Sequence, residues 1–114
     1  MKNGVNKVTL VGNVGDEPKI NHFDNDGLVA NFPLATNEIY VDKNGGEVKK
    51  TQWHRIVVWN NRARVVEDYI KKGDPLYLEG RIQTSSWEDK DGVKRFSTEI
   101  ICDNFIMLGG KKEN

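Results

Sequence analysis

The chain has 114 residues, a length typical of one domain, and it carries equal numbers of acidic and basic side chains, 17 of each. This balance favours no class of partner, although it leaves room for a locally basic surface. One cysteine excludes an intrachain disulfide, and no apolar stretch approaches the ~20 residues of a membrane span. Because the N-terminus has no signal-peptide core, we expect a protein that is soluble in a reducing compartment.

The first half of the chain indicates β structure. Alternation of apolar and polar residues predicts strands over 5–15, 19–23, 28–40 and 51–60. Pro33 favours an edge or bulge position within the third of these strands. A polar hairpin tip is expected over 41–50, where Asn44, Gly45 and Gly46 supply positive-φ positions.

The second half indicates one helix and two more strands. The spacing predicts a helix over 61–73, with an apolar face made of Ala63, Val66, Tyr69 and Ile70, and with Gly73 after its last turn. Strands are expected over 74–83 and 98–108, joined by a long hairpin over 84–97. Cys102 lies in an apolar run, which favours a buried, inert thiol.

The order of elements predicts the fold class. Five main strands with a short helix between the third and the fourth form the order of the OB-fold, an all-β, five-stranded Greek-key barrel. A β-sandwich, the alternative, would more naturally have about seven strands and no helix. We assign 1–108 to this domain and 109–114 to a flexible C-terminal stub.

The stretch "TQWHRIVVWNN" has an unusual face. Because side chains alternate along a strand, Trp53, Arg55 and Trp59 point one way, whereas Ile56 and Val58 point to the core. An arginine between two tryptophans would need a buried partner in a core. On a surface, the rings accept stacked bases and the guanidinium meets phosphates, which is how single-stranded nucleic acid binds.

Core packing is the alternative interpretation of a strand tryptophan, since tryptophan is highly buried on average. Two further aromatics, Tyr40 and Trp87, weaken that interpretation because each lies where a strand runs into a long hairpin. Both hairpin tips carry lysines, but they also carry acids. An ordinary solvated surface of mixed charge therefore remains the alternative interpretation of the tips.

Several ordered blocks, "GVNKVTLVGNVGDEP", "VANFPLATNE", "TQWHRIVVW", "YIKKGDPLYLEGRIQTSSWEDKDG" and "MLGG", together resemble the bacterial single-stranded DNA-binding protein family. The resemblance covers about residues 4 to 110. It implies an OB-fold that usually assembles as a homotetramer and coats single strands during replication, recombination and repair, in the bacterial cytoplasm at the nucleoid.

The resemblance also implies residue roles. Family stacking positions fall on Tyr40, Trp53, Trp59 and Trp87, of which the first is commonly tryptophan and the third commonly phenylalanine. Basic positions associated with the DNA path fall on Lys43, Arg55 and Lys72. His54 matches a histidine that supports subunit contacts, although a hydrogen-bonded strand histidine is an alternative interpretation.

Two features depart from the family pattern. Well-studied members have extra basic residues before the last tryptophan, where this chain has Gln83, Ser85 and Ser86. Arg81 compensates in part, so we expect fewer phosphate contacts along that hairpin and hence weaker binding or a shallower salt dependence. Members usually continue into an acidic-tipped tail that docks replication and repair proteins. This chain stops at "GGKKEN", which fits either a truncated chain or a naturally short form, so that docking is not assigned to these residues.

Other classes of function have less support in the sequence. The two histidines and one cysteine show no metal-ligand spacing, and no nucleophile, phosphate-loop or dinucleotide motif is present, so we expect neither catalysis nor a cofactor. An OB-fold for RNA, oligosaccharide or protein remains a rival. A structural domain whose tryptophans lie in a subunit interface is the other rival.

Overall fold

The computed structural model describes residues 3–109, and six strands and one α-helix lie within that range. The strands are β1 (Val8–Val14), β2 (Lys19–His22), β3 (Leu28–Val41), β4 (Glu47–Trp59), β5 (Pro75–Glu88) and β6 (Lys94–Met107). A 3-10 turn, η1 (Asp24–Asp26), joins β2 to β3, and the helix α1 (Asn60–Tyr69) follows β4.

Five strands close into a barrel. The hydrogen-bonded order is β1-β5-β6-β4-β3, and β3 pairs with β1 to complete the ring, while β2 adds to the side of β3. All pairings are antiparallel except that of β4 with β6. The helix lies between the third and fourth barrel strands in the chain, which confirms the predicted OB-fold order.

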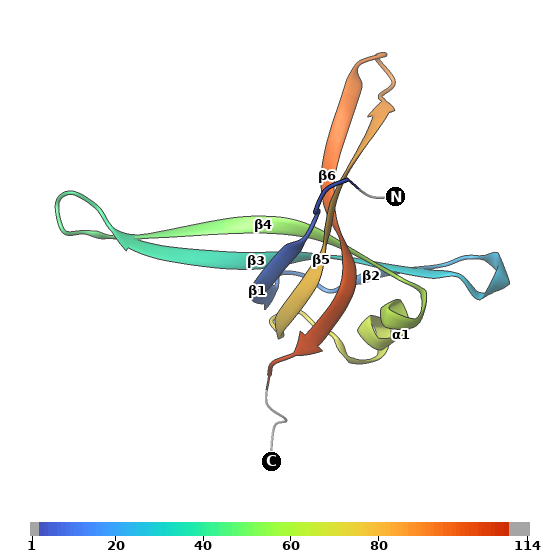
Figure 1. The fold of residues 1–114 in the computed structure, drawn as a ribbon, viewed down its shortest axis with the longest axis horizontal. Coiled ribbons are helices and arrows are strands. Elements are labelled where there is room, and N and C mark those ends of the chain that lie inside the picture. The colour runs from blue at the N-terminus through green and yellow to red at the C-terminus, as the bar shows by residue number, and fades with distance from the viewer. Residues whose placement is uncertain (1–2, 110–114) are drawn as a thin grey trace.

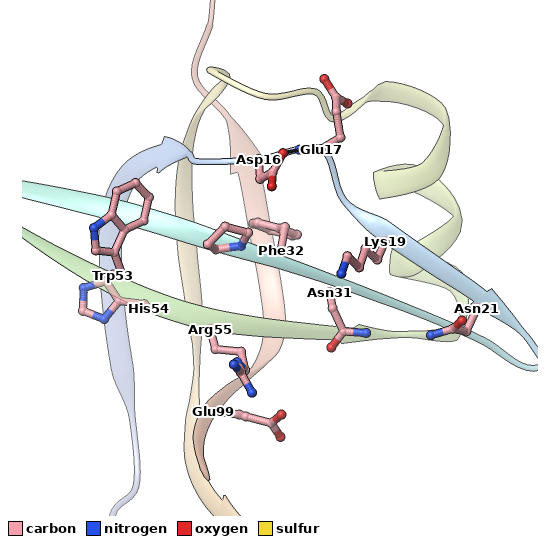
Figure 2. A pocket seen from close by; sticks show the side chains of 11 residues that line it. Asp16, Glu17, Lys19, Asn21, Asn31, Phe32, Trp53, His54, Arg55 and Glu99 are labelled. Atoms are coloured by element: carbon pink, nitrogen blue, oxygen red, sulfur yellow. Dashed lines mark hydrogen bonds between the residues drawn. The ribbon is translucent and has the colours of Figure 1, made fainter.

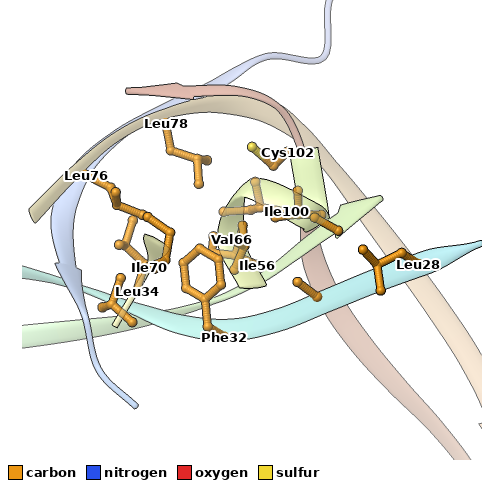
Figure 3. Close-up of a cluster of buried hydrophobic side chains, with 14 residues drawn as sticks. Leu28, Phe32, Leu34, Ile56, Val66, Ile70, Leu76, Leu78, Ile100 and Cys102 are labelled. Carbon is orange, nitrogen blue, oxygen red and sulfur yellow. The ribbon is translucent and has the colours of Figure 1, made fainter. Parts of the chain in front are cut away.

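The barrel interior is apolar and continuous. Phe32, Leu34, Ile56, Leu76 and Leu78 are fully or almost fully buried in it, as Figure 3 shows. The helix closes one end through Ala63, Val66 and the residue after the helix, Ile70. These residues occupy one face of each element, as alternation along strands and helical spacing require.

The β3–β4 and β5–β6 hairpins extend far beyond the barrel (Figure 1). The β3–β4 ladder runs out to the pair Val41 and Glu47, and the β5–β6 ladder runs out to the pair Glu88 and Lys94. Their turns therefore span only 42–46 and 89–93, much shorter than the polar tips expected over 41–50 and 84–97. Beyond the barrel each arm is a two-stranded ladder, in which the backbone groups that face the partner strand are paired and the others face outward.

The predicted helix was too long. It ends at Tyr69, whose side chain is exposed, and Lys71, Lys72 and Gly73 lie beyond it. The backbone of this segment has other partners: the Lys71 amide donates to Asp74 Oδ2 at 2.9 Å, and the Gly73 amide donates to the Val14 carbonyl at 2.7 Å. These bonds replace another helical turn and join the segment to β1.

Pro33 occupies an edge-like position, as predicted. Its carbonyl accepts the Gly15 amide at 2.8 Å, between the stretch of β3 that pairs with β2 and the stretch that pairs with β1. The missing N–H therefore faces the side of β3 where neither β1 nor β2 pairs with it at this residue, whereas the pairing with β4 on the other side continues, and no ladder bond is lost.

Candidate nucleic-acid interface

The outer face of β4 carries the two tryptophans and the arginine predicted from alternation. Trp53 is 63% exposed and Trp59 is 48% exposed, and Arg55 between them is also exposed. Ile56 and Val58, which have the opposite parity, are fully buried in the barrel. The rings are therefore surface features and do not fill the core.

A groove of about 600 Å³ runs across this face, below the β1–β2 connection (Figure 2). Figure 2 shows Trp53 at one end of the groove, Asn21 at the other and Arg55 between them. Asp16 belongs to the opposite wall, which the β1–β2 connection supplies. Trp53 lies close to that wall, since a β-carbon built on Gly15 would overlap Cζ3 of its ring.

The groove has charges of both signs. Arg55 and Lys19 bring positive charge, whereas Asp16, Glu17 and Glu99 bring negative charge. The guanidinium of Arg55 donates one hydrogen bond to Ser97 Oγ at 3.2 Å, which fixes its direction without neutralising it. The groove therefore offers a ring, amides and an unneutralised guanidinium to a ligand.

The floor beyond Arg55 is apolar. Val29, Val57 and Ile101 form a small buried cluster on the outer face, separate from the barrel core. Val57 pairs with Ile101 across β4 and β6, and Val29 pairs with Trp59 across β3 and β4. The cluster thus lies next to Trp59.

One aromatic of this surface was missed by the sequence analysis. Phe23, directly after β2, stacks with Trp59: their ring centroids are 6.1 Å apart and their planes differ by 22°. Phe23 is 50% exposed. The β2–β3 hairpin brings Phe23 to Trp59. Predicting this contact would have required the register of that hairpin, in which His22 pairs with Leu28.

Trp87 lies on the β5–β6 hairpin and is 50% exposed. It pairs with Arg95, whose Nε donates to Asp89 Oδ2 at 2.9 Å. Phe96, with the opposite parity, is 66% exposed, and Lys94 Nζ lies 5.8 Å from its ring centroid. Both faces of this hairpin therefore carry an exposed ring.

Tyr40 and Lys43 belong to the other hairpin. Tyr40 is exposed and pairs with Val48, so its parity is that of the barrel interior and differs from that of Trp53. Lys43 is exposed in the turn itself. The structure therefore does not bring Tyr40 onto the face that carries Trp53 and Trp59.

The remaining predicted cations differ in surroundings. Arg81 lies in the same cross-strand row as Ile101 and Val57, and it donates to Asp103 Oδ1 at 2.7 Å, so it is an ion-paired side chain. Lys72 is exposed in the turn after α1, where its backbone amide donates to Glu17 Oε2 at 3.3 Å. It therefore lies beside the connection that forms one wall of the groove.

His54 is half-buried and has the parity of the barrel interior. Its Nε2 lies 2.9 Å from Thr36 Oγ1, so one ring nitrogen has a hydrogen-bond partner within the chain. The structure therefore confirms the alternative interpretation, a hydrogen-bonded strand histidine. A role in subunit contacts stays a prediction.

Residues 3–109 offer little for metal or thiol chemistry. No group of three or more His, Cys, Asp or Glu side chains is placed to hold a metal ion there. Burial raises the pKa of the Cys102 thiol to about 11, in keeping with the predicted inert cysteine. Among the helices of this range, none is long and apolar enough to cross a membrane.

Comparisons with known proteins agree with this geometry. The family model described as "Single-strand binding protein family" matches residues 5–108. A single-stranded DNA-binding protein of Bacteroides thetaiotaomicron is 48% identical over 112 residues, which cover 96% of this chain and 70% of that protein. Single-stranded DNA-binding protein 1 of Chlorobaculum tepidum is 45% identical over 112 residues, covering 97% of this chain and 69% of that protein.

A solved structure is similar as well. The Plasmodium falciparum SSB in complex with ssDNA superimposes with a TM-score of 0.86 at 36% sequence identity. The match covers 96% of this chain and 99% of that one.

Proposed function

Because this chain belongs to the single-strand binding protein family, we propose that it binds and protects single-stranded DNA without regard to base sequence. The single observation that carries the mechanism is the exposure of Trp53 and Trp59 on one strand face with Arg55 between them. Family membership likewise supports a binding protein and not an enzyme.

Base stacking supplies the affinity in this proposal. Trp53, Trp59, Trp87 and Tyr40 each present about half or more of their side-chain surface to solvent. Stacking contributes about 1–3 kcal/mol per base and tolerates every base, since each has a π-face. Tyr40 lies on the other face of its hairpin, so the strand would have to pass over the hairpin edge to reach it.

The rest of the binding affinity comes from phosphate contacts, which we assign to Lys43, Arg55, Lys72 and Arg81. Each contact releases counterions, so binding weakens as salt rises. Arg55 is held by a neutral hydroxyl, so no ion pair has to be broken there, whereas Arg81 must first exchange Asp103 for a phosphate. Because an exposed ion pair contributes only about 0–1 kcal/mol, that exchange costs little.

Self-association, as a homotetramer, belongs to the same proposal. Within the described residues, β1 pairs with β3 only at Asn13 and Val14, so its edge over 8–12 keeps unpaired backbone groups. Exposed strand edges and apolar patches favour association with another copy. Val11 and Ile106, both more than half exposed, form such a patch with Tyr77 across β1, β5 and β6, and His54 is proposed to support a subunit contact.

The cellular setting is proposed on the bacterial relatives. A protein that coats unpaired strands acts where duplexes are opened, which means replication, recombination and repair at the nucleoid in the cytoplasm. Replication and repair proteins are the expected protein partners, and they would join through a tail of the kind that the family carries.

Fluorescence titration tests the proposal directly. Adding oligo-dT should quench the intrinsic tryptophan emission strongly and in a salt-sensitive way, because stacked bases contact the exposed indoles. Duplex DNA of the same length should compete poorly, since its bases are already stacked, and oligo-rU measures any preference between DNA and RNA. Unchanged emission at low salt would instead favour the subunit-interface interpretation of the tryptophans.

A further inference from the structure

We propose that Phe23 and Trp59 together form an additional base-stacking subsite, so that the bound strand continues beyond Trp59 toward the β2–β3 hairpin. This inference rests on the proposed function and extends it, because Phe23 has no assigned role in the stacking set above. The occupant is an unpaired nucleobase of the same bound strand.

The geometry of the ring pair carries the proposal. The two rings are nearly parallel, with planes that differ by 22° and centroids 6.1 Å apart, which is an offset-stacked arrangement. If Phe23 served only to pack against Trp59, its ring would be mostly covered. Half of each side chain instead stays open to solvent, so the pair presents aromatic surface to a ligand.

The hairpin holds Phe23 in place. Its backbone amide donates to the Gly27 carbonyl at 2.8 Å, which closes the turn around η1. The neighbouring His22 lies 3.1 Å from Glu67 Oε2, and this contact joins β2 to α1. The ring is therefore presented by a fixed support, which lowers the entropy lost when a base stacks on it.

The subsite is continuous with the proposed strand path. Trp59 lies next to Phe23. Beyond Trp59 come the cluster of Val29, Val57 and Ile101 and then Arg55 in the groove. A strand lying on Trp59 therefore meets Phe23 as the next aromatic ring in this direction.

Charge near the subsite distinguishes it from the rest of the interface. The turn beside Phe23 has two acidic residues, Asp24 and Asp26, and no basic residue. Acidic side chains repel phosphates, so binding here must come from the base and not from counterion release. The subsite should consequently contribute affinity without adding to the salt dependence.

The test compares F23A, F23L and F23W with the wild type in oligo-dT titrations over several salt concentrations. F23A should bind about 5- to 150-fold more weakly, the range that corresponds to one stacked base. F23L, which keeps apolar volume but has no π-face, should lose nearly as much, and F23W should keep wild-type affinity. The slope of log affinity against log salt should be the same in all four proteins.

A control and a chemical readout complete the design. Tyr69 is a similarly exposed aromatic at the end of α1, and Y69A should bind like the wild type. Ultraviolet cross-linking to oligo-dT, followed by peptide mass spectrometry, should give an adduct at Phe23 in the wild type. Thermal melting shows whether each variant is folded.

The outcomes separate this inference from the proposed function. Wild-type protein that fails to bind oligo-dT would overturn both. Wild-type binding together with F23A and F23L at wild-type affinity, and with no adduct at Phe23, would overturn only the additional subsite. A loss in F23A that F23L fully restores would show that Phe23 acts through volume, which also contradicts stacking.

Discussion

At Gly15 the missing side chain shapes the interface. A β-carbon there would overlap Cζ3 and crowd the neighbouring ring carbons of Trp53, so the ring lies against the bare backbone of the β1–β2 connection. The contact could not be predicted from the sequence, because the two residues are far apart in the chain and Gly15 lies in a connection that does not pair with β4.

We predict that Gly15→Ala displaces the Trp53 ring and weakens oligo-dT binding by up to ~1–3 kcal/mol, the contribution of one stacked base. The indole emission maximum should shift in the free protein, because the solvation of the ring changes. Gly4→Ala is the matched control, since a β-carbon there meets nothing within 4 Å. Wild-type affinity and emission in Gly15→Ala would show that the contact does not position the ring.

Single residues were predicted well where parity alone decided their direction. Alternation along one strand separated Trp53 and Trp59 from Ile56 and Val58, and burial confirms that separation. Tyr69 was wrongly placed on the apolar face of the helix, because the helix ends at that residue and the chain turns away. The stack of Phe23 on Trp59 depends on two hairpins meeting in space, which no single-strand pattern contains.

At the scale of elements, the two long hairpins end in turns with matching hydrogen bonds. In the first turn, one carboxylate oxygen of Asp42 accepts the amides of Asn44 and Gly46, at 2.9 and 2.8 Å. In the second, Asp89 accepts the amides of Asp91 and Val93, both at 2.9 Å. Gly45 and Gly92 hold the corresponding positive-φ positions, at 80° and 79°.

The pKa of the Asp89 carboxyl should reveal this turn. The backbone hydrogen bond from Val93, followed by that from the Arg95 side chain, lowers the pKa of Asp89 below its usual 3.8. A carboxyl whose pKa is depressed on folding stabilises the turn above its unfolded-state pKa, and this contribution disappears as the pH falls through the folded value. The Val93 amide shift, followed by NMR, should therefore titrate with a midpoint below 3.8.

Substitution gives the matching test. Asp89→Ala should speed exchange of the Asp91 and Val93 amides with solvent while leaving the melting temperature nearly unchanged, since the tip lies outside the barrel core. Asp42→Ala should affect only the other hairpin. Val93 exchange at the wild-type rate in Asp89→Ala would mean that the carboxylate does not order the turn.

Element order was predictable from the sequence, whereas element length was not. Alternation, turn residues and one helical pattern were enough for the five-stranded barrel with its helix. The hairpin arms beyond the core have no hydrophobic pattern to mark them, and the helix end is set by bonds from the Lys71 and Gly73 amides to Asp74 and β1. Local helix propensity does not predict such tertiary hydrogen bonds.

For the whole molecule, the balanced charge limits binding through phosphates. Two exposed arginines, Arg81 and Arg95, form ion pairs with Asp103 and Asp89. The groove itself has acidic residues beside Lys19 and Arg55. This arrangement supports the expectation of a shallow salt dependence, with stacking as the larger contribution.

Releasing Arg81 from its ion pair should increase the contribution of phosphate contacts to binding. Asp103→Asn removes the carboxylate that competes with phosphate for Arg81, so we expect tighter oligo-dT binding and a salt slope that is steeper by up to ~0.7, the value for one full phosphate contact on a single strand. Asp68→Asn on α1 alters the net charge equally and should leave the slope unchanged. Equal slopes in both variants would exclude Arg81 from the strand path.

Assembly is the other property of the whole molecule. His54→Tyr removes the contact to Thr36 and enlarges a half-buried side chain, so we expect the oligomer to dissociate at higher protein concentration than in the wild type. Analytical ultracentrifugation over a dilution series measures this. His22→Tyr alters the only other histidine of the chain and should leave the association constant alone. An association constant equal to that of the wild type in His54→Tyr would contradict the proposed interface role.

The central claim is that indole rings on the outer face of β4 accept unpaired bases, and calorimetric titration of Trp53→Ala with oligo-dT tests it most directly. We predict binding weaker by ~1–3 kcal/mol, a circular dichroism spectrum like that of the wild type, and partial recovery in Trp53→Phe. A correctly folded Trp53→Ala protein that binds oligo-dT with wild-type affinity would contradict the claim.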